Sequence, residues 1–325
     1  MQLKIGNIET AHGYFDRSMK KAKKVFDQKK ASVKTKDPFE KSLKLERERL
    51  FAIREIVAKD MSAITTAFPS LDNISEFYKE LIKTTMDFDK LRKELAGCNW
   101  VMKKTADLVR MFAKDYASSK DKPDLLIKKR SFMGRFSSLF KRIDFEYLEK
   151  ARKIFKKFPS IKSGLFTVAI AGFPNVGKST LLSKITPATP EINSYAFTTK
   201  GLNTGYMNYK YNKLQFIDTP GTLNRLEKMN AVEKQAYIAM KYASHLLVFV
   251  YDLTESSYPL ELQHQLKRNI ESYGKDIIVY LSKNDILEEE ILNKFISDNP
   301  ELEIYKDVDS LKKRIIKYFV KDYLM

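Results

Sequence analysis

The first half of the chain places apolar residues at the spacing of amphipathic helices. Apolar side chains recur in steps of three, four or seven, with polar residues between them. Asp37-Pro38 suits a helix cap followed by a first-turn proline, and Pro69 and Pro159 close two of the runs. The stripes cover residues 39–68, 95–116 and 132–158, and weaker patterns lie near 10–30 and 72–90. Long amphipathic helices with short joints predict a helical bundle.

The second half changes to short apolar runs rich in β-branched and aromatic residues. They cover residues 166–171, 214–217, 245–251 and 276–281, with helix-like segments near 178–186, 230–243, 257–273 and 308–322. Strands that alternate with helices predict a mainly parallel sheet. Pro159-Ser160 is the natural hinge. We therefore expect a helical domain over 1–160 and an α/β domain over 161–325.

Length and composition narrow the class of protein. The chain has 325 residues and 43% hydrophobic residues, which suits two folded domains at roughly 100–200 residues each. A single cysteine, Cys98, excludes a disulfide framework and favours the cytoplasm. No apolar run approaches the roughly 20 residues of a membrane span, and the N-terminus lacks the apolar core of a signal peptide. We expect a cytoplasmic monomer.

The positive charge is concentrated in the first half. Residues 1–160 hold 38 lysines and arginines against 22 acidic residues, whereas residues 161–325 hold 21 against 19. This excess favours a polyanion partner, with nucleic acid ahead of an anionic membrane, over a merely solvated charged face. No aromatic-rich RNA-recognition string is present, so base-specific readout is not indicated. The candidate RNA-binding residues are Arg17, Lys20, Lys21, Lys24, Lys128, Lys129, Arg130 and Arg135.

A phosphate-binding loop follows the first predicted strand. Residues 172–179 fit the pattern G-x-x-x-x-G-K-[ST], with an apolar strand before them and a helical segment after them. Backbone N–H groups at the start of that helix would point at the phosphates. Lys178 would reach the β- and γ-phosphates, and the Ser179 hydroxyl would bind Mg²⁺. The phosphate-binding residues are Gly172, Asn175, Val176, Gly177, Lys178, Ser179 and Thr180.

Two segments further along fit a magnesium and γ-phosphate site. Asp218-Thr219-Pro220-Gly221 ends a strand-like run, so Asp218 could hold Mg²⁺ through water and the Gly221 N–H could contact the γ-phosphate. Alone, the segment would be an ordinary turn after a strand. Phe197-Thr198-Thr199-Lys200 lies between these motifs, and one of its threonines could complete the Mg²⁺ shell while γ-phosphate is bound.

Ser282-Lys283-Asn284-Asp285 lies where GTPases place the guanine-binding sequence Asn-Lys-x-Asp. The Asp285 carboxylate could accept two hydrogen bonds from guanine, which adenine cannot supply, and the Lys283 stem could pack on the base. A charged turn after a strand is the alternative interpretation.

These motifs resemble the Obg-related translation-factor GTPases, and the rest of the chain resembles the nucleolar GTP-binding protein (Nog) family. The resemblance is carried by Phe68-Pro69-Ser70-Leu71-Asp72, Phe77-Tyr78, Asp89-Leu91-Arg92-Lys93, Trp100, Phe158-Pro159 and Phe197-Thr198-Thr199-Lys200-Gly201. It covers nearly the whole chain and indicates an archaeal-type member, since eukaryotic members carry a long C-terminal extension. It implies a helical bundle fused to a Ras-like P-loop GTPase domain and a role in large-subunit assembly.

The resemblance also implies roles for individual residues. Ser179 and Thr199 would bind Mg²⁺ directly, with Asp218 in its outer shell, and Lys283 and Asp285 would bind guanine. An asparagine at the position of Asn175 helps hold K⁺ in several related GTPases, so K⁺ is a second possible cofactor. The residues implied in catalysis are Lys178, Thr199 and Gly221.

The chain departs from the family pattern at three places. Thr222 follows Gly221, where Ras-like proteins have a glutamine and the family a hydrophobic residue, so slow intrinsic hydrolysis is expected. Ser282 replaces the asparagine whose amide braces the base-binding loop against the phosphate loop. The last base-binding motif is not recognisable, and Glu301–Lys306 is expected in its place.

The function we predict is hydrolysis of GTP to GDP and phosphate by a switch that acts in large ribosomal subunit assembly. Its partners would be GTP, GDP and the rRNA of the large subunit or its precursor, with no membrane. One alternative is an RNA-binding scaffold with a weakly hydrolysing GTPase domain, which Thr222 and Ser282 favour. The other is a GTPase acting at membranes, against which the absence of a lipidation motif weighs.

Overall fold

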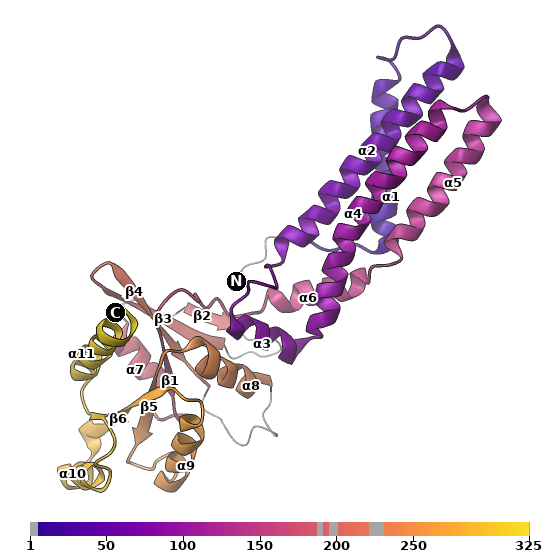
Figure 1. The fold of residues 1–325 in the computed structure, drawn as a ribbon. Coiled ribbons are helices and arrows are strands. Elements are labelled where there is room, and N and C mark those ends of the chain that lie inside the picture. The colour runs from indigo at the N-terminus through magenta and orange to yellow at the C-terminus, as the bar shows by residue number, and fades with distance from the viewer. Residues whose placement is uncertain (1–5, 187–190, 195–200, 221–230, 325) are drawn as a thin grey trace. The chain divides into compact units, whose positions relative to one another are not determined.

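The fold described here is that of a computed structural model, which describes residues 6–186, 191–194, 201–220 and 231–324. The chain divides into two compact units (Figure 1). A helical unit consists of Gln2–Ile74 and Met86–Lys156, and a sheet unit consists of Ser75–Thr85 and Lys157–Met325. The segment 75–85 therefore packs with the sheet unit, although it lies within the range expected for the helical domain.

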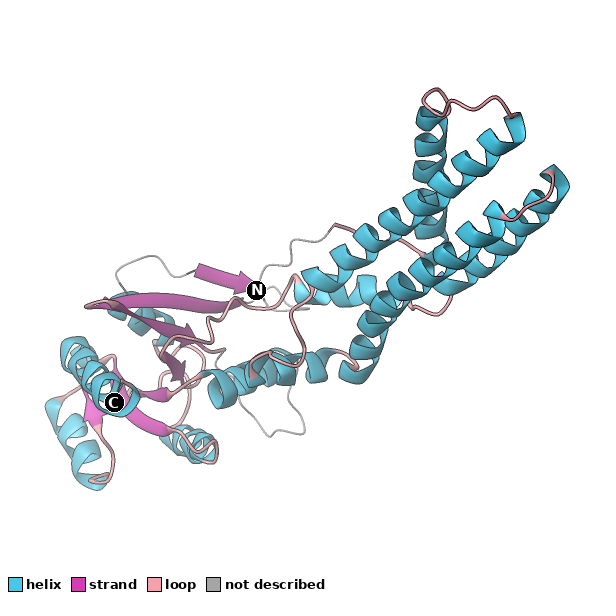
Figure 2. Cartoon of the chain, turned by 45° about the horizontal axis from the view of Figure 1, so that its top comes forward, coloured by secondary structure: helices cyan, strands magenta, loops and turns pink. Residues whose placement is uncertain are grey.

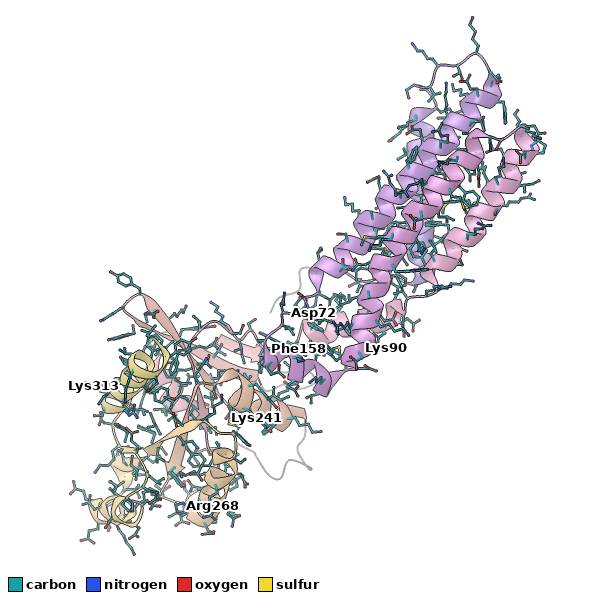
Figure 3. All side chains as sticks on the ribbon, viewed as in Figure 1. Asp72, Lys90, Phe158, Lys241, Arg268 and Lys313 are labelled. Carbon is teal, nitrogen blue, oxygen red and sulfur yellow. The ribbon has the colours of Figure 1, made fainter. Side chains whose placement is uncertain are left out.

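Antiparallel packing of long helices builds the helical unit. Its helices are α1 (Ala11–Lys29), α2 (Pro38–Ala67), α4 (Phe88–Ala117), α5 (Lys122–Phe140) and α6 (Phe145–Phe155). Helix α2 packs against α1 and α4, and α5 completes the bundle by packing against α4 and α1. Polar side chains project outward along these helices (Figure 3). The predicted helical bundle is confirmed.

Side-chain caps and an aromatic core account for these helices. The carboxylates of Asp37, Asp87 and Asp121 accept backbone N–H groups at the starts of α2, α4 and α5. Within the bundle, the rings of Phe132 and Phe136 stack at 5.5 Å. Phe112 meets Phe132 edge to face, and Phe140 meets Phe136 in the same way. Such pairs contribute about 0.5–1.5 kcal/mol each beyond burial of their surface.

The apolar stripe over 132–158 forms two helices rather than one. Helix α5 ends at Phe140 and α6 begins at Phe145. The Asp144 carboxylate accepts the backbone N–H of Tyr147 at 2.9 Å and so starts a new helix. The apolar spacing continues from α5 into α6 because both helices bury their apolar residues. Likewise, the weak pattern over 72–90 yields only α3 (Glu76–Thr85) and the start of α4.

A buried ion pair on α6 anchors the beginning of the described chain. Arg152 is only 4% exposed, and it donates to the Glu149 carboxylate at 2.7 and 2.6 Å. The same carboxylate accepts the backbone N–H of Ile8 at 2.9 Å, and Arg152 also donates to the Asn7 side chain. The hydrogen bond from Arg152, followed by that from Ile8, lowers the pKa of Glu149 to about 2.

Replacing Glu149 by glutamine is expected to lower the free energy of unfolding by about 2–3 kcal/mol near neutral pH, because Arg152 stays buried without its charged partner. The pKa of Glu149 is lower in the folded state than its ordinary 4.5. Its stabilising contribution is therefore complete above about pH 4.5 and is lost as the pH falls toward about 2.

Urea unfolding at stepped pH values measures this contribution. The difference between wild type and Glu149→Gln should shrink below about pH 4.5. Glu146→Gln, at an exposed position on the same helix, is the matched control. A difference that is independent of pH would contradict the assignment.

The sheet unit is built on a seven-stranded sheet of the order β2-β3-β4-β1-β5-β6-β7 (Figure 2, magenta). β1 pairs in parallel with β4 and β5, and β6 continues this pattern to β7, whereas β2 and β3 are antiparallel. The predicted mainly parallel sheet is confirmed. The strands are β1 (Thr167–Ala171), β2 (Glu191–Ser194), β3 (Gly201–Tyr209), β4 (Asn212–Asp218), β5 (Leu246–Asp252), β6 (Asp276–Ser282) and β7 (Ile304–Tyr305).

The helices of the sheet unit follow its strands as a parallel α/β fold requires. They are α7 (Lys178–Ile185), α8 (Ala231–Ile238), α9 (Leu260–Glu271), α10 (Glu289–Asp298) and α11 (Val308–Tyr318), with π-helical turns at Ala239–Ala243 and Phe319–Tyr323. The apolar pattern missed α10 and the strands β2, β3 and β7. None of the described helices has the length and hydropathy needed to cross a bilayer.

Helix α3 joins the sheet unit through Tyr78. Its hydroxyl donates to the carbonyl of Pro159 at 2.8 Å and accepts the N–H of Ile161 at 3.1 Å. Burial, the largest cause, raises the pKa of Tyr78 to about 12, so the hydroxyl stays protonated at neutral pH. The segment expected to be a hinge is therefore held within the sheet unit by a residue distant in sequence.

Candidate functional site

The candidate site lies at the carboxyl end of the central strand β1, which pairs with β4 on one side and with β5 on the other. In open α/β sheets, ligands bind at the carboxyl ends of the strands beside such a central point. The loop after β1 leads into α7, Asp218 ends β4, and Asp252 and Ser282 end β5 and β6. Motifs that are more than 100 residues apart in the sequence therefore meet at one edge of the sheet.

The phosphate loop has the backbone that its glycines allow. Gly172 has φ 144° and Gly177 has φ 94°, and both values favour glycine. A Cβ on Gly172 would come within 2.8 Å of the Val250 carbonyl oxygen, so the loop can pass β5 only without a side chain there. Asn175 has φ 64°, a left-handed conformation that asparagine tolerates better than most residues. The loop is thus shaped by local sequence.

Lys178 begins α7 and is folded back over the loop. Its side chain is buried, and Nζ donates to the Phe173 carbonyl at 2.6 Å. Burial lowers the pKa of Lys178 to about 8, an effect that the negative charge of Asp218 partly offsets. A buried ammonium with one carbonyl partner is costly unless an anion arrives to pair with it.

Asp218 presents one satisfied and one unsatisfied carboxylate oxygen. Oδ2 accepts the Ser179 hydroxyl at 2.6 Å and the Asn203 side-chain amide at 3.2 Å. Oδ1 is buried and has no hydrogen-bond partner among the described residues. Burial, the largest cause, raises the pKa of Asp218. An unpaired buried oxygen of this kind needs a donor, and a metal-bound water would supply one.

The oxygen donors at this edge fit Mg²⁺. Protein sites for Mg²⁺ typically supply one or two oxygen ligands, while phosphates and water complete the octahedron. The Ser179 hydroxyl and Asp218 provide such a set. Among the described residues there is no group of three or more His, Cys, Asp or Glu side chains that could hold a metal without a nucleotide.

Ser282 lies beside the phosphate loop and bonds the neighbouring strand. The Ser282 hydroxyl donates to the Tyr251 carbonyl at 2.9 Å, and the side chain is buried. A Cβ on Gly177 would come within 3.4 Å of the Ser282 Cβ. Ser282 therefore ties β6 to β5 and lies close enough to Gly177 that only a side chain added there would contact it.

Lys283 is held by a buried carboxylate. It has a left-handed backbone, φ 51°, and its Nζ donates to Asp252 at 2.6 Å and to Ser256 at 2.9 Å. Burial raises the pKa of Asp252, but the hydrogen bonds from Lys283 and Thr254 outweigh it, so the net pKa is lowered. Asp252 is thus ionised and positions the lysine of the candidate base-binding loop.

The candidate base-reading carboxylate is exposed. Asp285 lies in the short helix Asn284–Ile286, and its neighbour Asn284 donates through its side chain to the Lys306 carbonyl at 2.6 Å. This bond joins the candidate base-binding loop to the end of Glu301–Lys306, the segment expected to replace the missing motif. Contacts on both flanking residues therefore set the position of Asp285.

Sequence reasoning missed Asn203, Asp252 and Asn284. Asn203 pairs with Asp218 across β3 and β4, and no motif marks it. Asp252 could have been found because it ends a buried strand at the same sheet edge as the phosphate loop. Thr199, Gly221 and Thr222, together with the segment Phe197–Lys200, lie outside the described residues.

The predicted RNA-binding residues fall into two groups. Arg17 pairs with Glu9 and Asp60, Lys128 with Asp124, and Lys129 with Glu46, so these cations have partners inside the helical unit. Arg135 lies over the Phe112 ring. The remaining predicted residues are exposed and have no ion-pair partner among the described residues: Lys20, Lys21, Lys24 and Arg130.

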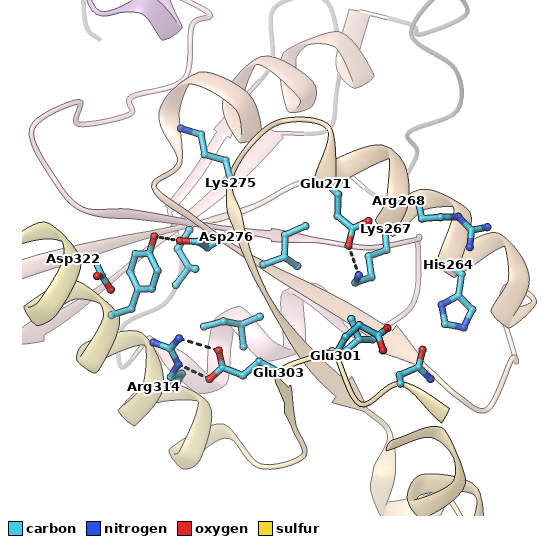
Figure 4. A pocket seen from close by; sticks show the side chains of 16 residues that line it. His264, Lys267, Arg268, Glu271, Lys275, Asp276, Glu301, Glu303, Arg314 and Asp322 are labelled. Atoms are coloured by element: carbon cyan, nitrogen blue, oxygen red, sulfur yellow. Dashed lines mark hydrogen bonds and ion pairs between the residues drawn. The ribbon is translucent and has the colours of Figure 1, made fainter. Parts of the chain in front are cut away.

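One large cavity lies away from the phosphate loop. It has a volume of about 750 Å³ and opens beside the first residues of β5 and β6, Leu246 and Asp276 (Figure 4). Its charges largely pair with one another: Arg314 bonds Glu303, Lys267 bonds Glu271, and Tyr318 bonds Asp276. A cavity whose charged side chains largely pair with one another does not suit a nucleotide phosphate.

A glycine-rich loop between β1 and α7, a buried lysine and an aspartate at the end of β4 define the fold class of P-loop GTPase domains. Residues 167–283 match the family described as 50S ribosome-binding GTPase, and residues 4–162 match the NOG1 N-terminal helical domain. The chain belongs to the nucleolar GTP-binding protein family, as its resemblance predicted.

The chain is also similar to individual proteins. An uncharacterised protein of the archaeon Methanocaldococcus jannaschii is 35% identical over 255 residues, covering 76% of this chain and 70% of that protein. Nucleolar GTP-binding protein 1 of Drosophila melanogaster is 34% identical over 279 residues, covering 81% of this chain and 42% of the relative. The chain thus spans less than half of that relative's length. A crystal structure from Plasmodium falciparum with the same protein name shares 28% identity, covers 51% of this chain and 92% of that chain, and has a TM-score of 0.42.

Proposed function

We propose that this chain binds and hydrolyses GTP and acts as a nucleotide-dependent switch in assembly of the large ribosomal subunit. The observation that carries the proposal is the buried Lys178 at the phosphate loop, together with the unpaired Asp218 oxygen at the same sheet edge. Both groups have unfavourable surroundings without a ligand, and a magnesium-bound polyphosphate would satisfy both.

In the proposed site, different residues bind the phosphates, the metal ion and the base. Backbone N–H groups of Asn175–Thr180 and the Lys178 ammonium bind the phosphates. Ser179 and Thr199 would hold Mg²⁺, with Asp218 in its outer shell, and the ion would supply positive charge to the phosphates. The Gly221 N–H contacts the γ-phosphate, so loss of that group releases its loop. Lys283 and Asp285 bind the guanine base.

The attacking group is water, and catalysis comes mainly from charge stabilisation by Lys178 and backbone N–H groups. Thr222 offers no general base, so hydrolysis by the chain alone is slow. The exposed Asn175 side chain would help hold K⁺, which would supply further positive charge to the phosphates. The helical unit contacts rRNA through exposed cations such as Lys20, Lys21 and Lys24.

Two assays with the full chain test this function. Equilibrium binding of labelled GTP, GDP and ATP should show a preference for the guanine nucleotides. Phosphate release should be slow alone, faster with purified 50S subunits, and faster in KCl than in NaCl. Absence of guanine preference would contradict the switch and leave an RNA-binding scaffold, which the substitution at Ser282 favours. Equal rates in the two salts would remove only the role of K⁺.

A further inference from the structure

A groove between α2 and α4 is lined by cations that no sequence motif groups together. It has a volume of about 310 Å³, and Arg47 and Arg54 line it from α2 while Arg110 and Lys114 line it from α4. Ala106, Ala113 and Ala117 lie along α4, with Val109 and Phe51 completing the lining. None of the described acidic residues lines it. We call these four cations the groove cations.

The groove cations are available for a ligand. All four residues are exposed, and Arg47 and Lys114 have no ion-pair partner among the described residues. Arg54 pairs with Glu55 and Arg110 with Asp107, but these are surface pairs at 2.6 and 3.8 Å. Pairs of this kind contribute little and are readily exchanged for a stronger anion.

The donors of the groove favour a phosphodiester backbone over an acidic helix. Three of the four groove cations are arginines, whose planar forks bind phosphate oxygens through two parallel hydrogen bonds. The small alanine side chains let a backbone approach the groove floor closely.

The groove lies on a different side of the bundle from the predicted basic residues of α1. Helix α1 packs against α2 and α5, and α4 packs against α2 and α5. The α2/α4 side is therefore opposite the α1/α5 side. Lys20, Lys21 and Lys24 belong to α1, so the bundle carries two separate basic surfaces.

We infer that the α2/α4 groove is a second RNA-binding surface, which holds the phosphate backbone of an rRNA segment while the α1 surface contacts another. The inference rests on the proposed rRNA-binding function and locates a binding surface that the sequence did not reveal. Recognition is by backbone charge and shape, because the groove offers no exposed aromatic platform for bases other than the half-buried Phe51.

The test compares two full-length variants of equal net charge. The groove variant combines Arg47→Gln, Arg54→Gln, Arg110→Gln and Lys114→Gln. The matched control combines Lys34→Gln, Lys36→Gln, Lys120→Gln and Lys122→Gln, four exposed lysines at or beside the bundle's loops. Binding of a protein-free large-subunit rRNA transcript is measured over a series of KCl concentrations, and thermal melting shows that each variant folds.

Each phosphate contact contributes roughly 0.7–0.9 to the slope of log affinity against log salt, so the groove variant should lose about 3 units of slope. Its affinity should fall at least about tenfold at moderate salt, and the control should lose less than half as much. Equal losses in both variants would overturn the inference, because net charge alone would then explain them.

Two other results are decisive. Failure of the wild-type chain to bind rRNA would overturn the proposed rRNA function itself, whereas normal rRNA binding by the groove variant would overturn only the groove. Poly-L-glutamate serves as a competitor of acidic-protein chemistry. If it bound wild type as tightly as rRNA at matched charge and lost that binding in the groove variant, the groove would be a protein-binding surface and the RNA inference would be wrong.

Discussion

Replacement of Lys178 by methionine is expected to weaken GTP binding at least about 100-fold without destabilising the folded protein. The ammonium would make charge-assisted hydrogen bonds to two phosphates. Each is worth about 1.5–3 kcal/mol, so the loss of both corresponds to a factor of roughly 10² to 10⁴. Few single changes in the chain should affect function as strongly.

The expected stability of this variant follows from the burial of Lys178. Among the described residues its Nζ bonds the Phe173 carbonyl alone, and burial depresses its pKa to about 8. Methionine has a similar length and needs no hydrogen bond, so it removes the desolvation penalty. Asp218 loses a favourable charge at the same time. We expect these two effects to leave the melting temperature unchanged or slightly raised.

Isothermal titration with GTP and thermal melting of the same samples check both parts. Lys184→Met is the matched control, because Lys184 is exposed on the same helix, α7. It should bind GTP as wild type does. Retained GTP affinity in Lys178→Met would show that the loop does not bind phosphate through this lysine. A large fall in melting temperature would show that Lys178 serves the fold instead.

The sequence predicted the fold best where local chemistry decides it. Gly172 and Gly177 define the phosphate loop because their backbone angles exclude most other residues. The buried strands of the parallel sheet were predicted from continuous apolar runs, since both faces of such strands are covered. The antiparallel strand β3 was missed because its sequence, Gly201–Tyr209, mixes glycine, asparagine and tyrosine.

Features that depend on tertiary contacts could not be predicted from spacing. Tyr78 joins the sheet unit through the backbone of Pro159, which lies 81 residues away. Asp252 acts on Lys283 across two neighbouring strands, 31 residues apart. The ion pairs of Arg17 and Lys129 likewise depend on α2, so a basic sequence run did not reveal which cations are available. Charge counts predict a polyanion partner, and they do not indicate which surface would bind it.

Replacement of Asp285 by asparagine is expected to lower GTP affinity at least about 100-fold and to create affinity for xanthosine triphosphate. Guanine presents N–H donors at N1 and at its exocyclic amino group, and a carboxylate accepts both. Asparagine offers one acceptor and one donor, so it mismatches guanine and leaves a polar group unpaired, a mismatch that costs several kcal/mol. Xanthine carries a carbonyl oxygen in place of the amino group, which the new amide can donate to.

The surroundings of Asp285 make this substitution a clean test of base recognition. Lys283 is held by Asp252, and Asn284 is held by the Lys306 carbonyl, so the loop has support on both sides of the changed residue. Asp285 itself is exposed and shares no hydrogen bond or ion pair with either anchor. The substitution should therefore change the donor–acceptor pattern while the loop keeps its geometry.

Equilibrium dialysis with labelled GTP, XTP and ATP measures the exchange of specificity. Asp298→Asn, at an exposed position on α10, is the control and should leave all three affinities as in wild type. Unchanged GTP binding in Asp285→Asn would show that this carboxylate does not read the base. Loss of GTP binding without a gain for XTP, at an unchanged melting temperature, would show that Asp285 supports the loop rather than the donor–acceptor match. Only the reciprocal change, weaker GTP and stronger XTP, assigns base recognition to Asp285 and shows that guanine specificity survives the replacement of asparagine by Ser282.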